Sequence, residues 1–359
     1  MKSKRLLALL LALSFLLLTA CSGRPEPAPV PTPAPTPEAT PEPTPEPTPE
    51  IWTGPRNPLT GEPMEEDISQ FRPWAILLDN LRAALPHNGI SQADIIYEMP
   101  VEGGITRMLA VFQDIRGVGE IGPVRSARSY FLDAVQGHDA IFVHAGGSPQ
   151  AYADIRGRGI PNIDGVLGTG REFFRDPDRS RRAGSEHSMM TTDELLLDHI
   201  EGHGFRREHE PGFSTGLAFQ LDDSVAASGL PGTEVTVRFS NYKTGEFVFD
   251  ETNGRYYVSQ YGEPMMDGAI DEQLSVVNVL VLFANFSAVD GEGRLAVDLN
   301  RGGNGYFFTG GSALPILWEK GSYTAPFLFS LTNGYPLELA IGNTYVNIVN
   351  TGTGELTFN

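Results

Sequence analysis

The chain has very little cysteine and a shortage of basic residues. Cys21 is the only cysteine among 359 residues, which excludes disulfide bonds within the chain and metal sites built from several cysteines. Asp and Glu outnumber Lys and Arg by 45 to 26, for a net charge of −19. This balance argues against nucleic acid as a partner and against a general attraction to anionic lipids. Any site for an anion must therefore be local.

The first twenty residues have the pattern of a secretion signal. Lys2, Lys4 and Arg5 form a basic start, and the apolar run from Leu6 to Leu18 is too short for a stable membrane span. The run ends in Leu-Thr-Ala-Cys, which resembles a bacterial lipobox. We expect residues 1–20 to be removed and Cys21 to carry acyl chains, palmitate among them. The chain would then be anchored by lipid to the outer face of the bacterial cytoplasmic membrane.

A spacer and two folded parts follow the predicted anchor. Residues 21–50 are rich in Pro, Thr and Glu and repeat TPEP, which predicts an extended disordered linker. Composition then becomes globular, and we divide the rest into an α/β domain at 51–210 and a β-rich domain at 211–359. The charged, irregular stretch around residues 175–209 predicts the boundary.

The stretch from residue 94 to 128 is the densest in charged and turn-forming residues. Ile95 to Glu102 predicts a strand with alternating faces. Gly103-Gly104 predicts a two-residue hairpin turn, with Ile105 to Gln113 as the returning strand. In that register Pro100 lies opposite Arg107, which places the guanidinium diagonally between two glutamates, Glu98 and Glu102.

The residues after this hairpin predict a site for an anion. Ser126 is a candidate N-cap of a short helix, so Arg125 and Arg128 would flank a helix N-terminus with free N–H donors. Together with Arg107 they would bind an anion. The competing interpretation is a salt-bridge network between these arginines and the glutamates.

Two apolar runs end in polar residues, where α/β proteins often place their sites. Trp74 to Asn80 predicts a buried strand that ends at Asp79, and Ala140 to His144 predicts another that ends at His144. Asp79 is a site candidate or a capping residue, and His144 is a ligand-binding or a structural histidine. Ser148 lacks the glycine pattern of a nucleophile elbow.

The C-terminal third predicts strands separated by Gly, Asn and Asp turns, as in Val235–Phe239, Ser275–Phe283 and Thr344–Val349. The predicted fold class is α+β: an α/β-like N-terminal domain with a mixed sheet, and a β-rich, mostly antiparallel C-terminal domain. No Walker, dinucleotide-binding or catalytic-triad pattern occurs in the sequence.

Several segments resemble the YerB-like bacterial lipoprotein family, whose domain has no known function. They are RPWAILLDN, ISQADIIYE, VEGGITRMLAVF, IGPVRSARSYFLD and HAGGSPQA. The resemblance covers residues 55 to 200 closely and a second family domain from about residue 220. His187 is kept from the family pattern, whereas Glu186 and Ser188 beside it differ.

The order of motifs also resembles the LytR-CpsA-Psr phosphotransferases, which attach pyrophosphate-linked glycopolymers to the cell wall. In that resemblance Asp79, Asp94, Arg107, Arg125 and Arg128 would hold pyrophosphate and a divalent ion such as Mg²⁺. No confident metal ligand or cofactor is predicted otherwise.

Two functions compete on these observations. The first is a lipid-anchored envelope protein that binds a cell-wall polymer or a wall-associated protein without catalysis. The second is a phosphotransferase acting on pyrophosphate-linked wall polymer. A glycosidase using Glu98 and Glu102 is disfavoured, because four residues along a strand place the carboxylates roughly 13 Å apart. Whether the chain is an enzyme stays open at this point.

Overall fold

A mixed sheet of eleven strands forms the centre of the computed structural model, which describes residues 52–168, 170–220 and 229–359. The predicted signal peptide, the lipidation site at Cys21 and the whole spacer lie outside these residues. Ten strands run in the order β10 (Leu230–Pro231), β22 (Ser312–Glu319), β21 (Gly303–Thr309), β18 (Asn278–Ala284), β25 (Thr344–Asn350), β2 (Ile95–Pro100), β3 (Thr106–Phe112), β1 (Trp74–Asp79), β5 (Ile141–His144) and β6 (Asn162–Asp164), and β23 (Leu328–Leu331) pairs with β22.

Most strands in the middle of this sheet run parallel. The pairs β1–β5, β5–β6, β2–β25 and β18–β25 are parallel, and β3 lies antiparallel between β1 and β2. The strands β1, β2 and β3 are buried along their whole length, as expected of a sheet covered on both faces. The parallel strands therefore end at one common edge, and polar residues at their carboxyl ends come together there.

The second sheet belongs wholly to the C-terminal half and is antiparallel. Its strands are β14 (Glu263–Pro264), β13 (Arg255–Gln260), β12 (Thr244–Asp250), β11 (Glu234–Arg238) and β26 (Glu355–Phe358), with β17 (Ser275–Val276) paired to β13. Along β13 buried and half-buried residues alternate, which is the pattern of a sheet with one face on the core.

Shorter elements complete the described structure. The α helices are α1 (Phe131–Gly137), α2 (Pro149–Arg158), α3 (Pro177–Ala183) and α4 (Asp193–His203), and the 3₁₀ helices are η1 (Arg82–Ala84), η2 (Ile90–Gln92), η3 (Glu102–Gly104) and η4 (Ser185–His187). Small sheets join β4 (Glu120–Ile121), β8 (Met189–Thr192) and β7 (Phe174–Arg175), β15 (Met266–Asp267) with β16 (Glu272–Gln273), β19 (Phe286–Ala288) with β20 (Leu295–Val297), and β24 (Leu339–Ala340) with β9 (Phe219–Gln220). No helix in the described part of the chain is both long and apolar enough to cross a bilayer.

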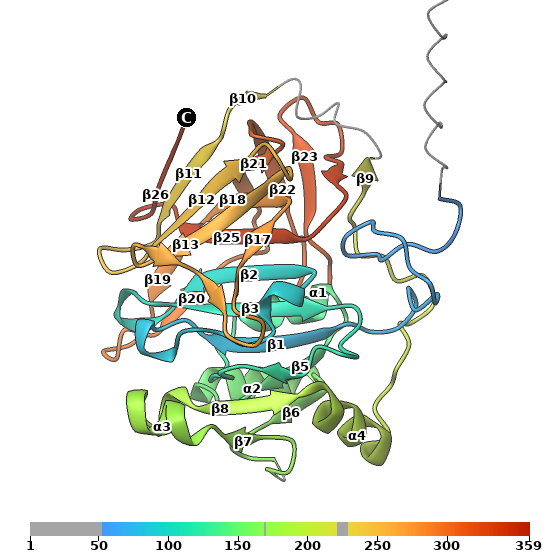
Figure 1. Ribbon diagram of the computed structural model, residues 1–359, viewed down its shortest axis with the longest axis vertical. Helices are drawn as coiled ribbons and strands as arrows, with labels where there is room; N and C mark the ends of the chain where they lie inside the picture. The colour runs from blue at the N-terminus through green and yellow to red at the C-terminus, as the bar shows by residue number, and fades with distance from the viewer. Residues whose placement is uncertain (1–51, 169, 221–228) are drawn as a thin grey trace, which may run out of the picture. The chain divides into compact units, whose positions relative to one another are not determined.

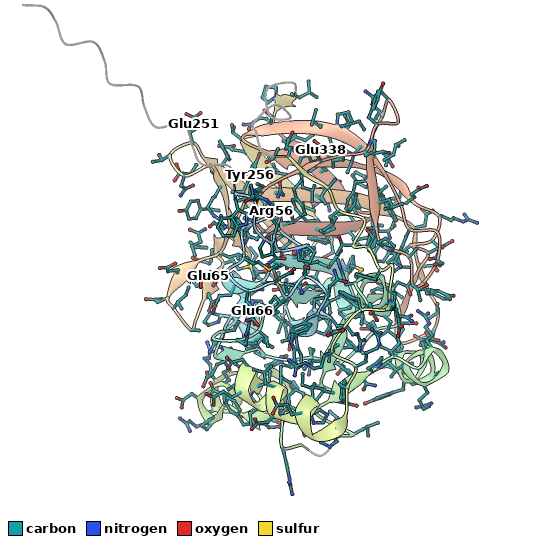
Figure 2. The ribbon with its side chains drawn as sticks, turned by 90° about the vertical axis from the view of Figure 1, so that its right-hand side faces the viewer. Arg56, Glu65, Glu66, Glu251, Tyr256 and Glu338 are labelled. Atoms are coloured by element: carbon teal, nitrogen blue, oxygen red, sulfur yellow. The ribbon has the colours of Figure 1, made fainter. Side chains whose placement is uncertain are left out.

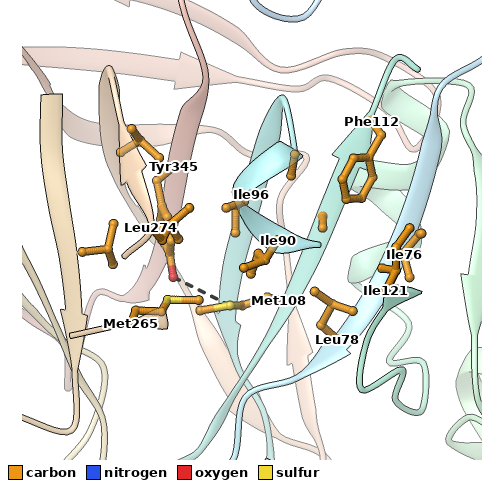
Figure 3. Packing of buried hydrophobic residues seen from close by; sticks show 14 of the residues in the cluster. Ile76, Leu78, Ile90, Ile96, Met108, Phe112, Ile121, Met265, Leu274 and Tyr345 are labelled. Carbon is orange, nitrogen blue, oxygen red and sulfur yellow. Dashed lines mark hydrogen bonds between the residues drawn. The ribbon is translucent and has the colours of Figure 1, made fainter. Parts of the chain in front are cut away.

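The two halves of the sequence share the central sheet and its core. Figure 1 shows β1, β2 and β3 in the middle, the orange and red strands above them, and the green elements below. Met265 and Leu274 pack in one cluster with Ile76 and Ile96, and the Tyr345 hydroxyl lies 3.9 Å from the Met108 sulfur (Figure 3). Residues 52–359 accordingly form one compact unit, and the boundary at residue 210 stays a prediction. The predicted α+β class is confirmed.

The turn between β2 and β3 is longer than predicted. The Val101 amide donates to the Ile105 carbonyl at 2.8 Å, so three residues form the turn, with Gly103 and Gly104 at φ angles of 72° and 76°. Arg107 therefore pairs with Met99, and the predicted pairing with Pro100 is wrong. Because a shift of one residue moves a side chain to the other face, Arg107 and Glu98 point away from each other.

The helix predicted to begin near Ser126 begins at Phe131 instead. The segment before it is extended, because Val124 bridges to Leu78 at the end of β1 and Ala127 bridges to Gly147. Arg125 and Arg128 therefore lie on an extended segment, and the prediction that they flank a helix N-terminus is wrong.

A candidate anion-binding site at the carboxyl end of the parallel strands

Three arginines and two carboxylates meet where β1 ends. Asp79 is the last residue of β1 and pairs with Arg107 near the start of the antiparallel β3. Arg125 and Arg128 reach the same place from the extended segment that follows β4, and Glu102 lies in the turn after β2. We call these three arginines the arginine cluster. The pairing of β1 with β3 places Arg107 in this cluster, and the backbone bridges of Val124 and Ala127 bring in Arg125 and Arg128.

Arg107 is the central member of the arginine cluster. It is only 5% exposed, and one terminal nitrogen donates to the Ser126 carbonyl. Among the described residues no carboxylate forms an ion pair with it, and its Nε has no hydrogen-bond partner. Burial, and then the positive charges of Arg128 and Arg125, lower the pKa of Arg107 to about 9. A buried cation without a bonded counter-charge is costly, so this position favours an anion.

Arg125 is held by Asp79 and by backbone. Its Nε lies 3.2 Å from Asp79 Oδ2, and its Nη1 donates to the Glu186 carbonyl at 2.7 Å. His187 Nδ1 lies 2.7 Å from the same Asp79 oxygen. With 25% of its side chain exposed, Arg125 is the member of the cluster most open to solvent. The sequence analysis assigned no role to His187. Its retention from the family pattern was the signal that could have marked it as part of this site.

Arg128 makes a two-pronged ion pair with Glu102. Its Nε and Nη2 lie 2.6 and 2.8 Å from the two carboxylate oxygens, a geometry that also suits phosphate. Burial raises the pKa of Glu102, but the hydrogen bonds and charge of Arg128 outweigh it, so the pKa is lowered. The pair is 14% and 20% exposed, which leaves its outer side accessible.

The site carries a positive charge on a molecule whose surface is largely acidic. Three guanidinium groups face two carboxylates, Asp79 and Glu102, whereas Glu65, Glu66, Glu251 and Glu338 lie exposed on the outside (Figure 2). The competing salt-bridge network is thus real for two of the arginines, but it leaves Arg107 without a carboxylate. The arrangement can bind one anionic group.

Glu98 does not belong to this site, because it faces the other side of the sheet. It is fully buried and forms a 3.1 Å ion pair with Lys243, which is itself buried. Tyr345, Asn80 and Thr106 donate hydrogen bonds to its two oxygens. Both glutamates of the disfavoured glycosidase hypothesis are therefore occupied by ion pairs with cations.

Asp94 lies at the opposite end of these strands from Asp79. Asp79 pairs with Arg107, whereas Ile95, next to Asp94, pairs with Val111; four residues along β3 correspond to roughly 13 Å. Asp94 accepts hydrogen bonds from the Gln113 amide at 2.5 Å and Asn57 at 2.8 Å. Burial raises its pKa to about 7. Asp79 and Asp94 cannot share a Mg²⁺ ion, and no group of three or more His, Cys, Asp and Glu in the described ranges could hold a metal.

His144 and Ser148 have structural partners. His144 is fully buried, with Nδ1 2.8 Å from the Gly146 carbonyl and Nε2 3.1 Å from Asn162 Oδ1. Its ring stacks on Phe142 at 4.6 Å. The Ser148 hydroxyl accepts from the Ala151 amide and caps α2. These contacts favour a structural role for His144 over the ligand-binding role that we also considered.

The fold and the site define a class of protein: a β-rich α+β domain with a mixed central sheet and a cationic site at the carboxyl end of its parallel strands. Residues 59–206 match the N-terminal domain of a family of unknown function, DUF3048, and residues 235–346 match its C-terminal domain. The chain is also 30% identical over 293 residues to the lipoprotein YerB of Bacillus subtilis, covering 81% of this chain and 85% of the relative. The chain belongs to this YerB-like family.

A solved structure agrees with the family assignment. The crystal structure of the YerB protein from Bacillus subtilis superimposes with a TM-score of 0.73 at 27% identity, covering 84% of this chain and 99% of that one. The family resemblance predicted from the motifs is therefore confirmed. None of these matches supports the phosphotransferase alternative.

Proposed function

We propose that this chain is a lipid-anchored envelope protein that binds an anionic group of a cell-wall polymer through the arginine cluster. The observation that carries the proposal is Arg107, a buried arginine without a carboxylate partner among the described residues, between two further arginines. A wall-associated protein that presents the same anionic group is the alternative occupant.

The anchor is supported by the sequence and by the relative. The lipobox pattern ends at Cys21, and the Bacillus subtilis relative carries the name lipoprotein. Acylation at Cys21 would hold the protein on the outer face of the cytoplasmic membrane. The Pro-rich spacer would then extend the folded part outward by about 3.1 Å for each residue, toward the wall.

The binding chemistry follows from the donors. Each guanidinium presents N–H groups in a plane that matches phosphate or carboxylate oxygens. Asp79 and Asp94 are not placed to hold a metal ion together, because Asp79 is bound to Arg125 and His187 and Asp94 lies at the far end of the strands. We therefore propose binding without catalysis.

Co-sedimentation with isolated cell-wall sacculi tests this function. The full-length protein, purified in detergent, should sediment with sacculi at low salt and lose binding as salt rises, since the contacts are ionic. Arg107→Met and Arg125→Met should each release most of the bound protein. Arg238→Met is the matched control, because Arg238 pairs with Glu355 on the surface of the second sheet. Undiminished sedimentation of both cluster variants would overturn the proposal.

A further inference from the structure

A groove of about 800 Å³ lies beside the arginine cluster, and its volume is typical of a small-molecule site. Residues before and in α1, residues of α2 and the β19–β20 hairpin line it. We propose that this groove binds a saccharide segment, so that the ligand is a hydroxyl-rich glycan whose single anionic group is held by the arginine cluster. The inference rests on the proposed function and names its ligand class.

The groove and the arginine cluster are continuous. Arg128 contributes to both, because it lines the groove and forms the ion pair with Glu102. Tyr130 also lines the groove, and its hydroxyl donates to the Pro100 carbonyl at 2.6 Å, at the end of β2 next to Arg107. A ligand with its anionic group at the arginines would therefore extend directly into the groove.

The charges along the groove argue against a polyanion. Its lining includes three arginines and four aspartates: Arg128, Arg158, Arg294, Asp133, Asp154, Asp290 and Asp298. Two of the arginines are paired within the lining, Arg158 with Asp133 at 2.6 Å and Arg294 with Asp290 at 2.9 Å. A second phosphate placed in the groove would meet paired arginines and surplus carboxylate. Only the end of the ligand at the arginine cluster is therefore anionic.

The same lining suits hydroxyl groups and the apolar faces of sugar rings. Ion-paired carboxylates and guanidinium groups are held in place, so they offer oriented hydrogen-bond acceptors and donors. A sugar hydroxyl can donate to the carboxylates and accept from the guanidinium groups. Asn300 lines the groove, and its side-chain oxygen is buried without a partner among the described residues. Tyr323 is half exposed and carries the Arg158 guanidinium on its ring at 3.8 Å, and Phe286 adds an apolar surface.

Calorimetric titration with three probes separates the sugar from its anionic group. The full-length protein in detergent is titrated with inorganic phosphate, N-acetylglucosamine, and N-acetylglucosamine 1-phosphate. We expect the sugar phosphate to bind at least ten-fold more tightly than inorganic phosphate. Ser287→Trp should fill the groove from an exposed strand position and reduce that ratio to about one, while inorganic phosphate still binds. Asn300→Ala should weaken the sugar phosphate by about two- to ten-fold, as for one hydrogen bond.

Ala288→Trp is the matched control for the groove. Ala288 is the next residue of β19, is exposed, and does not line the groove. It should leave the ratio unchanged. Equal affinities for inorganic phosphate and sugar phosphate, or a ratio that Ser287→Trp leaves unchanged, would overturn the groove proposal alone. If the wild type does not bind inorganic phosphate, or if Arg107→Met leaves the phosphate affinity unchanged, the proposed function is overturned instead.

Discussion

Neighbouring strands hold two ionic clusters with opposite properties on the two faces of the sheet. On one face Glu98 and Lys243 form a fully buried pair, surrounded by Tyr345, Asn80 and Thr106. On the other face Arg107 is buried without a carboxylate partner in the described structure, and Arg125 and Arg128 open to solvent. The first cluster is balanced and closed, whereas the second has surplus charge and an open side. Charge balance and access thus distinguish a structural from a binding role.

The largest expected effect comes from breaking the closed cluster. Lys243→Met leaves the Glu98 carboxylate buried without its cation, so we expect the free energy of unfolding to fall by about 3–5 kcal/mol. Urea unfolding of the full-length protein measures it. The double variant Glu98→Gln with Lys243→Met should recover much of the loss, because no unpaired charge remains. A loss below about 1 kcal/mol for the single variant would show that this buried pair does not have the structural role we assign to it.

Lowering the pH should reduce the stability of the fold by protonating a buried histidine, whereas the arginines of the cluster stay charged. Burial, and then the charges of Lys320 and His209, lower the pKa of His138 to about 4. Between pH 6.5 and 4 this histidine binds its proton more readily in the unfolded chain than in the folded one, so its contribution to stability falls as pH falls. At about 1.4 kcal/mol for each pKa unit, the loss from this one histidine reaches at most about 3.5 kcal/mol. Urea unfolding across this range measures it.

Replacing the histidine identifies its share of the acid effect. His138→Gln keeps a hydrogen-bond partner for the Tyr97 hydroxyl, 2.7 Å away in the native protein, and removes the titrating group. The slope of stability against pH should become shallower. Two other buried groups then set what remains, with opposite signs: His87, whose pKa burial also lowers to about 4, and Asp94, whose raised pKa favours the folded state as pH falls. His203→Gln, at an exposed position, should leave the slope unchanged. An unaltered slope in His138→Gln would assign the acid sensitivity to other groups.

The sequence predicted the elements better than it predicted their partners. Alternation along residues 95–101 correctly gave two faces of a strand, since Ile95, Tyr97 and Met99 pack in one core cluster and Ile96 in the other. The turn after it needed one residue more than Gly103-Gly104 suggested. That single residue decides whether Arg107 meets Glu98, and local sequence did not fix it.

Residues distant in the sequence decided the rest of the candidate site. Lys243 comes from the C-terminal half and neutralises Glu98, and His187 reaches Asp79 from 108 residues away. Neither contact has a local signal. By contrast, local sequence predicted Arg107, Arg125 and Arg128 as one cluster, because clustered arginines are visible in the sequence itself. Asp79 was a separate candidate as a polar residue at a strand end, and only the phosphotransferase resemblance joined it to the arginines, together with Asp94.

Arg107→Met tests whether the open cluster differs from the closed one as we argue. The free energy of unfolding should change by less than about 1 kcal/mol or rise, since a buried charge without a carboxylate partner is removed. Calorimetry should show inorganic phosphate bound at least ten-fold more weakly, as for the loss of one charge-assisted hydrogen bond of about 1.5–3 kcal/mol. Arg238→Met is the control for binding. A destabilisation as large as that of Lys243→Met would make Arg107 structural and erase the contrast between the clusters.

The smallest effect concerns the carboxylate that competes with the ligand. Glu102→Gln removes the negative charge that Arg128 now binds, and because the pair is partly exposed, stability should fall by only about 0.2–1 kcal/mol. The freed guanidinium should then bind inorganic phosphate several-fold more tightly at low salt, with a smaller gain at high salt. Glu355→Gln, which breaks the surface pair with Arg238, should leave phosphate affinity unchanged. If Glu102→Gln weakens phosphate binding instead, Glu102 orients Arg128 for the ligand, and the carboxylates belong to the binding site.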